Sequence, residues 1–237
     1  MSDLLQIARP VLLESSLCDG SPEKIYWGNG TSFLASYKNN CYFITAAHVM
    51  NKQSACASDL RIFPTDDSCI TIPFNSQYEL KPLASQPEDE YHDLYILRVD
   101  LPMHVINTDS TTYTIDLNNI IASPEMLSIG TKLGIMGFPS DSREINYDLK
   151  NIIYKRSVMS AQYNGKSFDH CYSLKINDNL GHTCLDGMSG SPVFSFHEID
   201  NGVLPKLIGI MIRGNGVSGE GHFISALVLK KALNLMV

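Results

Sequence analysis

Short stretches of apolar and β-branched residues alternate with polar turns along most of this chain. Two such stretches, residues 32–37 and 41–45, flank the tripeptide Lys38-Asn39-Asn40. Because asparagine tolerates left-handed backbone conformations, this spacing predicts two strands joined by a tight hairpin. Further strands are predicted at residues 60–63, 69–74, 94–99, 132–136, 152–160, 171–176, 192–196, 207–212 and 222–224.

Two segments depart from the strand pattern. Residues 101–125 are polar and rich in Thr, Asn and Asp, and we expect them to connect two strand-rich halves. After Ser225, leucines and lysines alternate at helical spacing, which predicts a helix over residues 226–236. The pattern therefore predicts an all-β protein with one helix at its C-terminus.

Composition and charge narrow the classes of function. A length of 237 residues suits one or two domains, and an apolar fraction of 44% is typical of a globular protein with a sizeable core. The net charge of −7 argues against a surface for nucleic acid or an anionic membrane, because phosphate groups are bound by clustered lysines and arginines. We therefore expect no nucleic-acid partner and no membrane partner.

The most informative motif is Gly187-Met188-Ser189-Gly190-Ser191-Pro192, in which a serine stands between glycines. A serine hydroxyl is a poor nucleophile at neutral pH and needs an adjacent base. The candidate base is His48, which ends Thr45-Ala46-Ala47-His48, and the candidate orienter of its imidazole is Asp93, which begins Asp93-Leu94-Tyr95-Ile96-Leu97. Gly187 allows a turn in which its own N–H and that of Ser189 converge on a developing oxyanion.

Each of these residues also has a purely structural explanation. Gly-x-Ser-Gly is a common turn composition, His48 suits a hydrogen-bonded core histidine, and Asp93 suits the cap of a strand. The combination is more specific than its parts. Separations of 45 residues from His48 to Asp93 and 96 from Asp93 to Ser189 fit two consecutive small barrels with a site between them. The chain order His, Asp, Ser also separates this triad from those of subtilisins and α/β-hydrolases.

In these motifs and their order the chain resembles the chymotrypsin/trypsin-fold serine proteases. The resemblance implies two six-stranded antiparallel β-barrels with a C-terminal helix, in one peptidase domain over residues 1–237. Residues 1–115 would form the barrel that carries His48, and residues 116–237 the barrel that carries Ser189.

The same resemblance implies a serine endopeptidase that works through an acyl-enzyme and needs no metal or organic cofactor. His48 would be general base and acid, Asp93 its orienter and Ser189 the nucleophile, with the N–H groups of Gly187 and Ser189 as oxyanion hole. An unrestricted protease would harm a cell, so we expect a narrow protein or peptide target. A dedicated activating or target protein in a bacterial regulatory or defence setting fits this expectation better than a viral polyprotein processor.

For specificity, the resemblance indicates three segments around a pocket. Thr183, six positions before the nucleophile, would form an uncharged floor. One wall would come from residues 207–214, which are similar to the strand along which such enzymes pair the substrate backbone. Because glycines would leave the walls open beside an apolar lining, we expect cleavage after large apolar residues. The pocket residues are Thr183, Met211, Ile212, Arg213, Gly214 and Gly221.

Departures from the secreted members of the family concern activation and location. Met188 stands where zymogen-activated members have an aspartate, so activation by N-terminal processing is not expected. Val49 and Leu185 stand where secreted members have cysteines, and residues 1–6 lack the features of a secretory signal. These observations predict a cytoplasmic protein with reduced thiols. The six cysteines are Cys18, Cys41, Cys56, Cys69, Cys171 and Cys184.

Two alternative functions remain open. The first is a catalytically silent protease fold that holds a peptide in its cleft, although retention of all three triad residues argues against it. The second is an esterase or acyl transferase, because the same triad serves this acyl chemistry.

Overall fold

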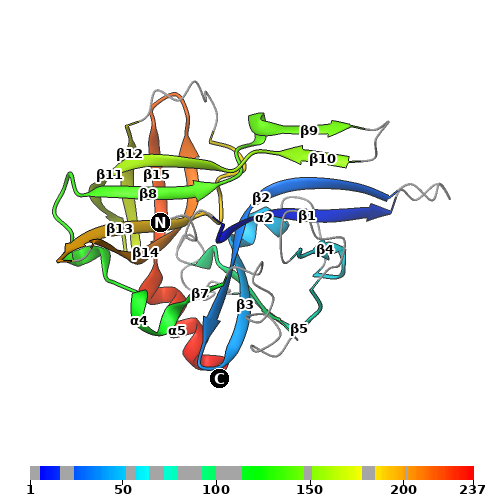
Figure 1. Cartoon of the computed structure of the whole chain (residues 1–237), viewed down its shortest axis with the longest axis horizontal. Helices are drawn as coiled ribbons and strands as arrows, with labels where there is room; N and C mark the ends of the chain where they lie inside the picture. Colours follow the sequence, from blue (N-terminus) through cyan, green and yellow to red (C-terminus); the bar gives the residue numbers. More distant parts are fainter. Residues whose placement is uncertain are drawn as a thin grey trace.

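Most of the regular structure that is described is β-strand, as Figure 1 shows. The computed structural model describes residues 6–16, 24–51, 57–63, 72–79, 92–99, 114–146, 151–177, 185–200 and 202–237. The predicted all-β fold with a C-terminal helix is confirmed. Within those segments, no helix has both the length and the apolar character that crossing a membrane requires.

The second half of the chain forms a closed six-stranded antiparallel barrel, seen at the left of Figure 1. Its inner and outer faces alternate as the strand geometry requires. In β11, for example, Met159, Ala161 and Tyr163 are buried while the residues between them are exposed. The barrel strands are β8 (Lys132–Gly137), β11 (Ser157–Phe168), β12 (Cys171–Ile176), β13 (Pro192–Ile199), β14 (Gly202–Asn215) and β15 (Glu220–Ser225).

The first half forms a curled sheet, a half-barrel that is open between β4 and β5 in the part of the chain described. At this opening the N–H of Ile72 donates to the carbonyl of Ile62 at 2.7 Å. The finer expectation of two closed barrels therefore holds only for the second half. The strands of the first half are β1 (Ala8–Ser16), β2 (Lys24–Tyr37), β3 (Asn40–Thr45), β4 (Leu60–Arg61), β5 (Phe74–Glu79) and β6 (Tyr95–Val99), and β7 (Ile115–Asp116) pairs with β2 in parallel.

Both halves have the same strand order. When the six strands of each half are numbered along the chain, their neighbours run 4-1-2-3-6-5 in the half-barrel, and the closed barrel has the same order with strands 5 and 4 also paired, which closes the ring. A separate two-stranded ribbon, β9 (Arg143–Asn146) with β10 (Asn151–Tyr154), is inserted after the first strand of the closed barrel. The two halves therefore share one topology, although no sequence repeat reveals it.

The predicted hairpin after Tyr37 is confirmed. Lys38 and Asn39 have φ angles of 45° and 63°, and Tyr37 pairs with Asn40 across the turn. Positive φ at both central residues gives the turn type whose twist matches that of the flanking strands.

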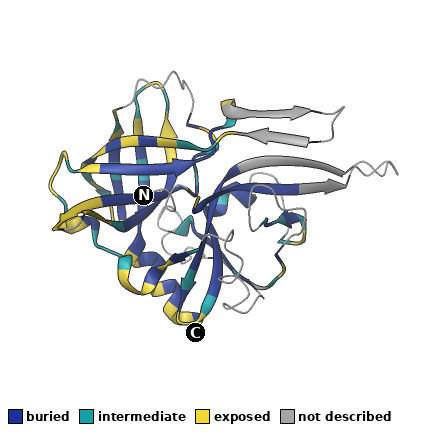
Figure 2. Ribbon diagram, in the orientation of Figure 1, coloured by how far each residue is buried: buried dark blue, intermediate teal, exposed yellow. Residues whose placement is uncertain are grey.

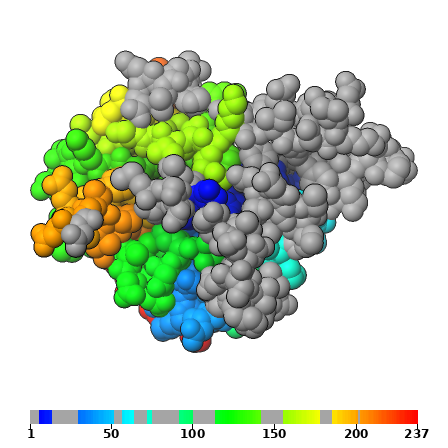
Figure 3. All heavy atoms as spheres, in the orientation of Figure 1, coloured from blue at the N-terminus to red at the C-terminus, as the bar shows by residue number. Residues whose placement is uncertain are grey.

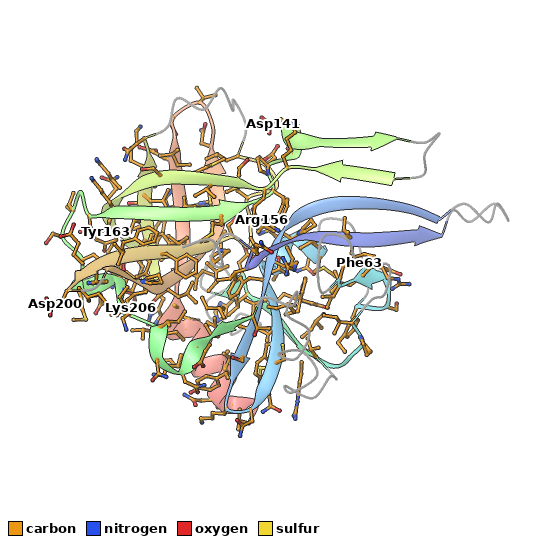
Figure 4. The ribbon with its side chains drawn as sticks, viewed as in Figure 1. Phe63, Asp141, Arg156, Tyr163, Asp200 and Lys206 are labelled. Carbon is orange, nitrogen blue, oxygen red and sulfur yellow. The ribbon has the colours of Figure 1, made fainter. Side chains whose placement is uncertain are left out.

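Other strand predictions need correction. The strand predicted at residues 152–160 is wrong, because the chain leaves one ladder after Tyr154 and enters another at Ser157. Between them, the Arg156 guanidinium lies over the Phe138 ring at 5.3 Å, at the junction between barrel and half-barrel (Figure 4). The strand predicted at 69–74 starts only at Phe74, with residues 69–71 outside the described part. Strand β1 was not predicted.

A shared apolar core joins the two halves, and Figure 2 shows it as the dark blue centre of the molecule. It contains Phe33 of the half-barrel, Phe194 of the closed barrel and Leu229 of the helix α5 (Ala226–Leu235). The predicted C-terminal helix is thus confirmed, and Ser225 caps it by accepting the Leu227 N–H at 3.2 Å.

The described part of the connection between the halves, residues 114–131, lies at the surface, where Figure 3 shows it in green between β13–β14 and the β2–β3 hairpin. Lys206 Nζ donates to the Asn119 carbonyl at 2.9 Å, and the N–H of Ala122 donates to the Leu207 carbonyl at 3.0 Å. These bonds fix the connection against the closed barrel. The short helices described are α2 (Ala47–Asn51), α4 (Leu117–Ile120), η1 (Ala57–Asp59), η3 (Pro124–Met126) and η4 (Ser140–Ser142).

Candidate active site

His48 and Asp93 lie together at the ends of two paired strands. His48 follows β3 as the second residue of α2, and Asp93 precedes β6, which pairs with β3. The imidazole Nδ1 and Asp93 Oδ2 are 2.5 Å apart, and the backbone N–H of His48 donates to Asp93 Oδ1 at 2.7 Å. One carboxylate therefore holds both the ring and the backbone of His48.

This arrangement determines what the imidazole can do. With Nδ1–H donated to a carboxylate, the neutral ring presents Nε2 as an acceptor. The exposed fractions of the His48 and Asp93 side chains are 27% and 22%, so the pair is partly shielded but still reachable. A partly buried, charge-assisted hydrogen bond of this kind is shorter and stronger than a neutral one.

Ser189 sits on a sharp turn in which both flanking glycines are needed. Gly187 and Gly190 have φ angles of 88° and 89°. A Cβ atom on Gly187 would lie 2.4 Å from the Phe138 carbonyl oxygen, and one on Gly190 would lie 1.9 Å from the Thr31 carbonyl oxygen. Both positions therefore require glycine for two reasons, the positive φ angle and the lack of space for a Cβ atom.

Backbone hydrogen bonds hold this turn against both halves of the molecule. From the half-barrel, the N–H of Thr31 donates to the Ser189 carbonyl at 2.8 Å. From β14, the Met211 carbonyl accepts the Gly190 N–H at 2.7 Å, and the Met211 N–H donates to the Ser191 carbonyl at 2.9 Å. The turn that carries Ser189 is therefore a junction between the halves.

The Thr31 hydroxyl forms a second junction that sequence reasoning missed. Fully buried Thr31 donates through Oγ1 to the Gly187 carbonyl at 2.7 Å and accepts the Phe138 N–H at 2.9 Å. Its own carbonyl accepts the Thr45 hydroxyl at 2.7 Å. A single threonine within a strand has no local sequence signal that distinguishes it from its neighbours.

Two backbone donors on the turn are available to a ligand. In the described part of the chain, neither the N–H of Gly187 nor that of Ser189 donates a hydrogen bond, and both residues are partly exposed. Between them, Met188 is fully buried and packs in the apolar core of the closed barrel. Among the described residues, the turn thus presents two N–H groups without a partner, one on either side of a buried side chain.

The Ser189 hydroxyl is hydrogen-bonded to the backbone of β14. Its Oγ donates to the Ile212 carbonyl at 3.1 Å, and no hydrogen bond joins it to His48 among the residues described. Catalytic hydrogen bonds are often unformed in proteins without substrate. A rotation of the serine side chain about its Cα–Cβ bond is the change that would redirect the hydroxyl.

The predicted pocket residues fall on different surfaces. Thr183 lies outside the described residues. Met211 and Ile212 are buried, with exposed fractions of 0% and 3%, whereas Arg213 and Gly214 are exposed. Gly221 is buried in β15 and pairs with Gly214 across the two strands. Of these residues, Ile212 touches the candidate nucleophile directly.

Two further sequence predictions concern metal-ligating groups and cysteine thiols. Among the described residues, no group of three or more His, Cys, Asp or Glu side chains is placed to hold a metal ion. Cys41 and Cys171 are buried free thiols, and burial raises the pKa of the Cys41 thiol to about 12. The other four cysteines lie outside the described part of the chain, so the prediction that all six are reduced stays a prediction.

Comparison with known proteins does not add to this picture. No protein-family model matches the sequence, and no curated protein is significantly similar to it. The chemistry of the site has to be argued from its geometry.

Proposed function

We propose that this protein is a serine endopeptidase of the chymotrypsin-like type. The observation that carries the proposal is the His48–Asp93 pair, held by two hydrogen bonds, in a molecule whose other half presents Ser189 on a turn between two positive-φ glycines. The identical strand order of the two halves and the closed second barrel are compatible with that fold.

The reaction begins with a rotation of Ser189. Its hydroxyl leaves the Ile212 carbonyl and turns toward His48 Nε2. As Oγ attacks the substrate carbonyl carbon, Nε2 takes the hydroxyl proton, and Asp93 stabilises the resulting imidazolium. The N–H groups of Gly187 and Ser189 donate to the oxyanion of the tetrahedral intermediate.

Collapse of that intermediate breaks the peptide bond. His48 gives its proton to the leaving amine, and the acyl group stays on Ser189 as an ester. A water molecule then attacks the ester, giving its proton to Nε2, and the acid product departs as Oγ recovers a proton. The vacated Ile212 carbonyl can meanwhile accept an N–H from a substrate strand lying along β14.

The positive-φ turn that carries Ser189 is supported by an apolar residue, Met188. Met188 is anchored by burial in the barrel core, where zymogen-activated enzymes use an aspartate. Apolar burial, which does not depend on a released amine, supports an enzyme that is active as synthesised. Control would then lie in a narrow protein target or a dedicated partner protein in the cytoplasm.

A second candidate function is peptide binding without cleavage. The Ser189–Ile212 hydrogen bond favours it, because a hydroxyl that stays on Ile212 cannot be deprotonated by His48. An esterase or acyl transferase would use the same residues on a different acyl group.

A fluorophosphonate probe tests the proposal, because it reacts with an activated serine hydroxyl and does not react with an unactivated one. We expect labelling of the wild-type protein at Ser189, located by peptide mass mapping, and none in Ser189→Ala. Labelling with hydrolysis of casein-derived peptides would support an endopeptidase. Labelling with ester hydrolysis alone would support the esterase. A folded wild-type protein that is not labelled would contradict the proposal and support peptide binding without cleavage.

A further inference from the structure

Gly214 and Gly221 face one another across β14 and β15, and one methyl group packs against both. A Cβ atom on Gly214 would lie 2.7 Å from Met211 Cε, and one on Gly221 would lie 3.1 Å from the same atom. Two leucines fill the remaining sides, with Leu185 Cδ1 at 2.6 Å from the Gly214 position and Leu174 Cδ1 at 2.8 Å from the Gly221 position. The space that two facing glycines leave is therefore occupied by side chains of this protein.

This space adjoins the candidate nucleophile. The backbone of Met211 pairs with Gly190 and Ser191, and the carbonyl of the next residue, Ile212, accepts the Ser189 hydroxyl. Paired glycines in adjacent strands are typical of places where a ligand or another chain approaches closely. A substrate strand along β14, with its carbonyl at Ser189, would direct the side chain of that residue toward Gly214 and Gly221.

We infer that Met211, with Leu185, limits the residue on the acyl side of the cleaved bond to glycine, alanine or serine. This inference rests on the proposed function and names its substrate class. Met211 is fully buried and Leu185 is 6% exposed, so a larger substrate side chain would have to expel a packed thioether from a close-packed interior. It replaces the expectation of a large apolar residue, which assumed that the glycine walls stay open.

Met211 can be truncated without breaking the turn that carries Ser189. Both hydrogen bonds between β14 and the turn use the Met211 backbone, so they persist in Met211→Ala. The substitution removes the thioether, including the Cε methyl group that packs against both glycines. Met159 offers a matched control, because it is buried in the same barrel core but on β11, so Met159→Ala removes the same atoms elsewhere.

The test measures kcat/KM on fluorogenic peptides that differ only in the residue before the cleaved bond, with active sites counted by fluorophosphonate labelling. A methylene group in or out of a pocket changes selectivity by about 10–200-fold, so we expect wild-type protein to prefer Ala over Leu by about that factor. Met211→Ala should reverse or abolish this preference, and Met159→Ala should keep it. Met211→Val, which keeps an apolar strand residue, repeats the test if the alanine variant does not fold.

The outcomes separate the inference from the proposed function. Labelled wild-type protein that prefers Leu or Phe would overturn the inference alone, and so would an unchanged Ala-to-Leu ratio in folded, labelled Met211 variants. Absence of both labelling and cleavage in folded wild-type protein would overturn the proposed function and the inference with it.

Discussion

Replacing Thr31 by valine should impair both the stability of the fold and the candidate oxyanion hole. Valine has the shape of threonine but no hydroxyl, so it removes the bonds of Oγ1 to the Gly187 carbonyl and from the Phe138 N–H. Thr31 is fully buried, and a cavity is not created. The effect therefore isolates the two hydrogen bonds.

The two lost bonds have different costs. The bond from Phe138 is buried, and a buried donor that loses its acceptor costs about 1–3 kcal/mol. The bond to Gly187 is partly buried, so water can replace the hydroxyl in part, and its net worth is about 0.5–1.5 kcal/mol. We expect the free energy of unfolding to fall by about 1.5–4.5 kcal/mol.

Activity should fall by a mechanism that stability does not explain. The Gly187 carbonyl is tied to Thr31, and freeing it lets the Gly187 backbone move away from the geometry that aims its N–H at the oxyanion. Loss of one such donor lowers kcat by about 10²–10³. KM should change little, because Thr31 contacts no part of a substrate lying along β14.

Urea unfolding and the rate of fluorophosphonate labelling measure the two effects. Thr31→Ser is the matched control, since it keeps Oγ1 and loses only a methyl group, and it should retain most of the labelling rate. A valine variant that unfolds at the wild-type urea concentration and is labelled at the wild-type rate would refute the role assigned to the Thr31 hydroxyl.

Three further predictions concern single residues. Asp93→Asn should fold normally but be labelled and turn over substrate about 10⁴-fold more slowly, because an amide facing Nδ1 stabilises the wrong tautomer of His48. Steady-state kinetics and circular dichroism measure the two effects, and a folded variant with the wild-type rate would show that the carboxylate is only structural. Gly190→Ala should lower the melting temperature, because its Cβ would lie 1.9 Å from the Thr31 carbonyl oxygen and the backbone there is left-handed. Gly202→Ala, which has open space around its Cβ, should lower the melting temperature less, and equal melting curves for the two variants would contradict this reasoning. Burial raises the pKa of the Cys41 thiol to about 12, so the folded protein keeps the thiol protonated at a pH where the unfolded chain ionises it. The free energy of unfolding should therefore decline between pH 9 and 12, and less steeply in Cys41→Ala. Urea unfolding at several pH values measures both slopes, and identical slopes would count against this burial effect.

Local signals in the sequence were sufficient for much of the fold. Strand β12 begins and ends at the predicted residues, and the asparagine turn after Tyr37 has the expected backbone. Strand β1 was missed because Arg9 and Pro10 interrupt its apolar pattern, although both are buried against the rest of the sheet. The break at Lys155-Arg156 was missed because it depends on a distant ring, that of Phe138, rather than on neighbouring residues.

Some residues of the candidate site could also be predicted from local sequence, and others could not. His48, Asp93 and Ser189 stand in short motifs whose residue types suggest their chemistry, and they could be proposed from the sequence alone. Thr31 could not, because its importance comes from bonds to residues more than 100 positions away. The conformation of Met211 could not be predicted either, since only the folded barrel decides whether a flexible thioether lines a space or fills it.

The shared strand order has a consequence for how the site is assembled. His48 lies in the connection between the third and fourth strands of the half-barrel, and Ser189 lies in the connection between the third and fourth strands of the closed barrel. The candidate base and the candidate nucleophile thus occupy equivalent connections of one repeated strand order. A small rotation of one half against the other would change the Ser189–His48 separation while leaving the internal bonds of each half intact, so turnover would report the alignment of the two copies.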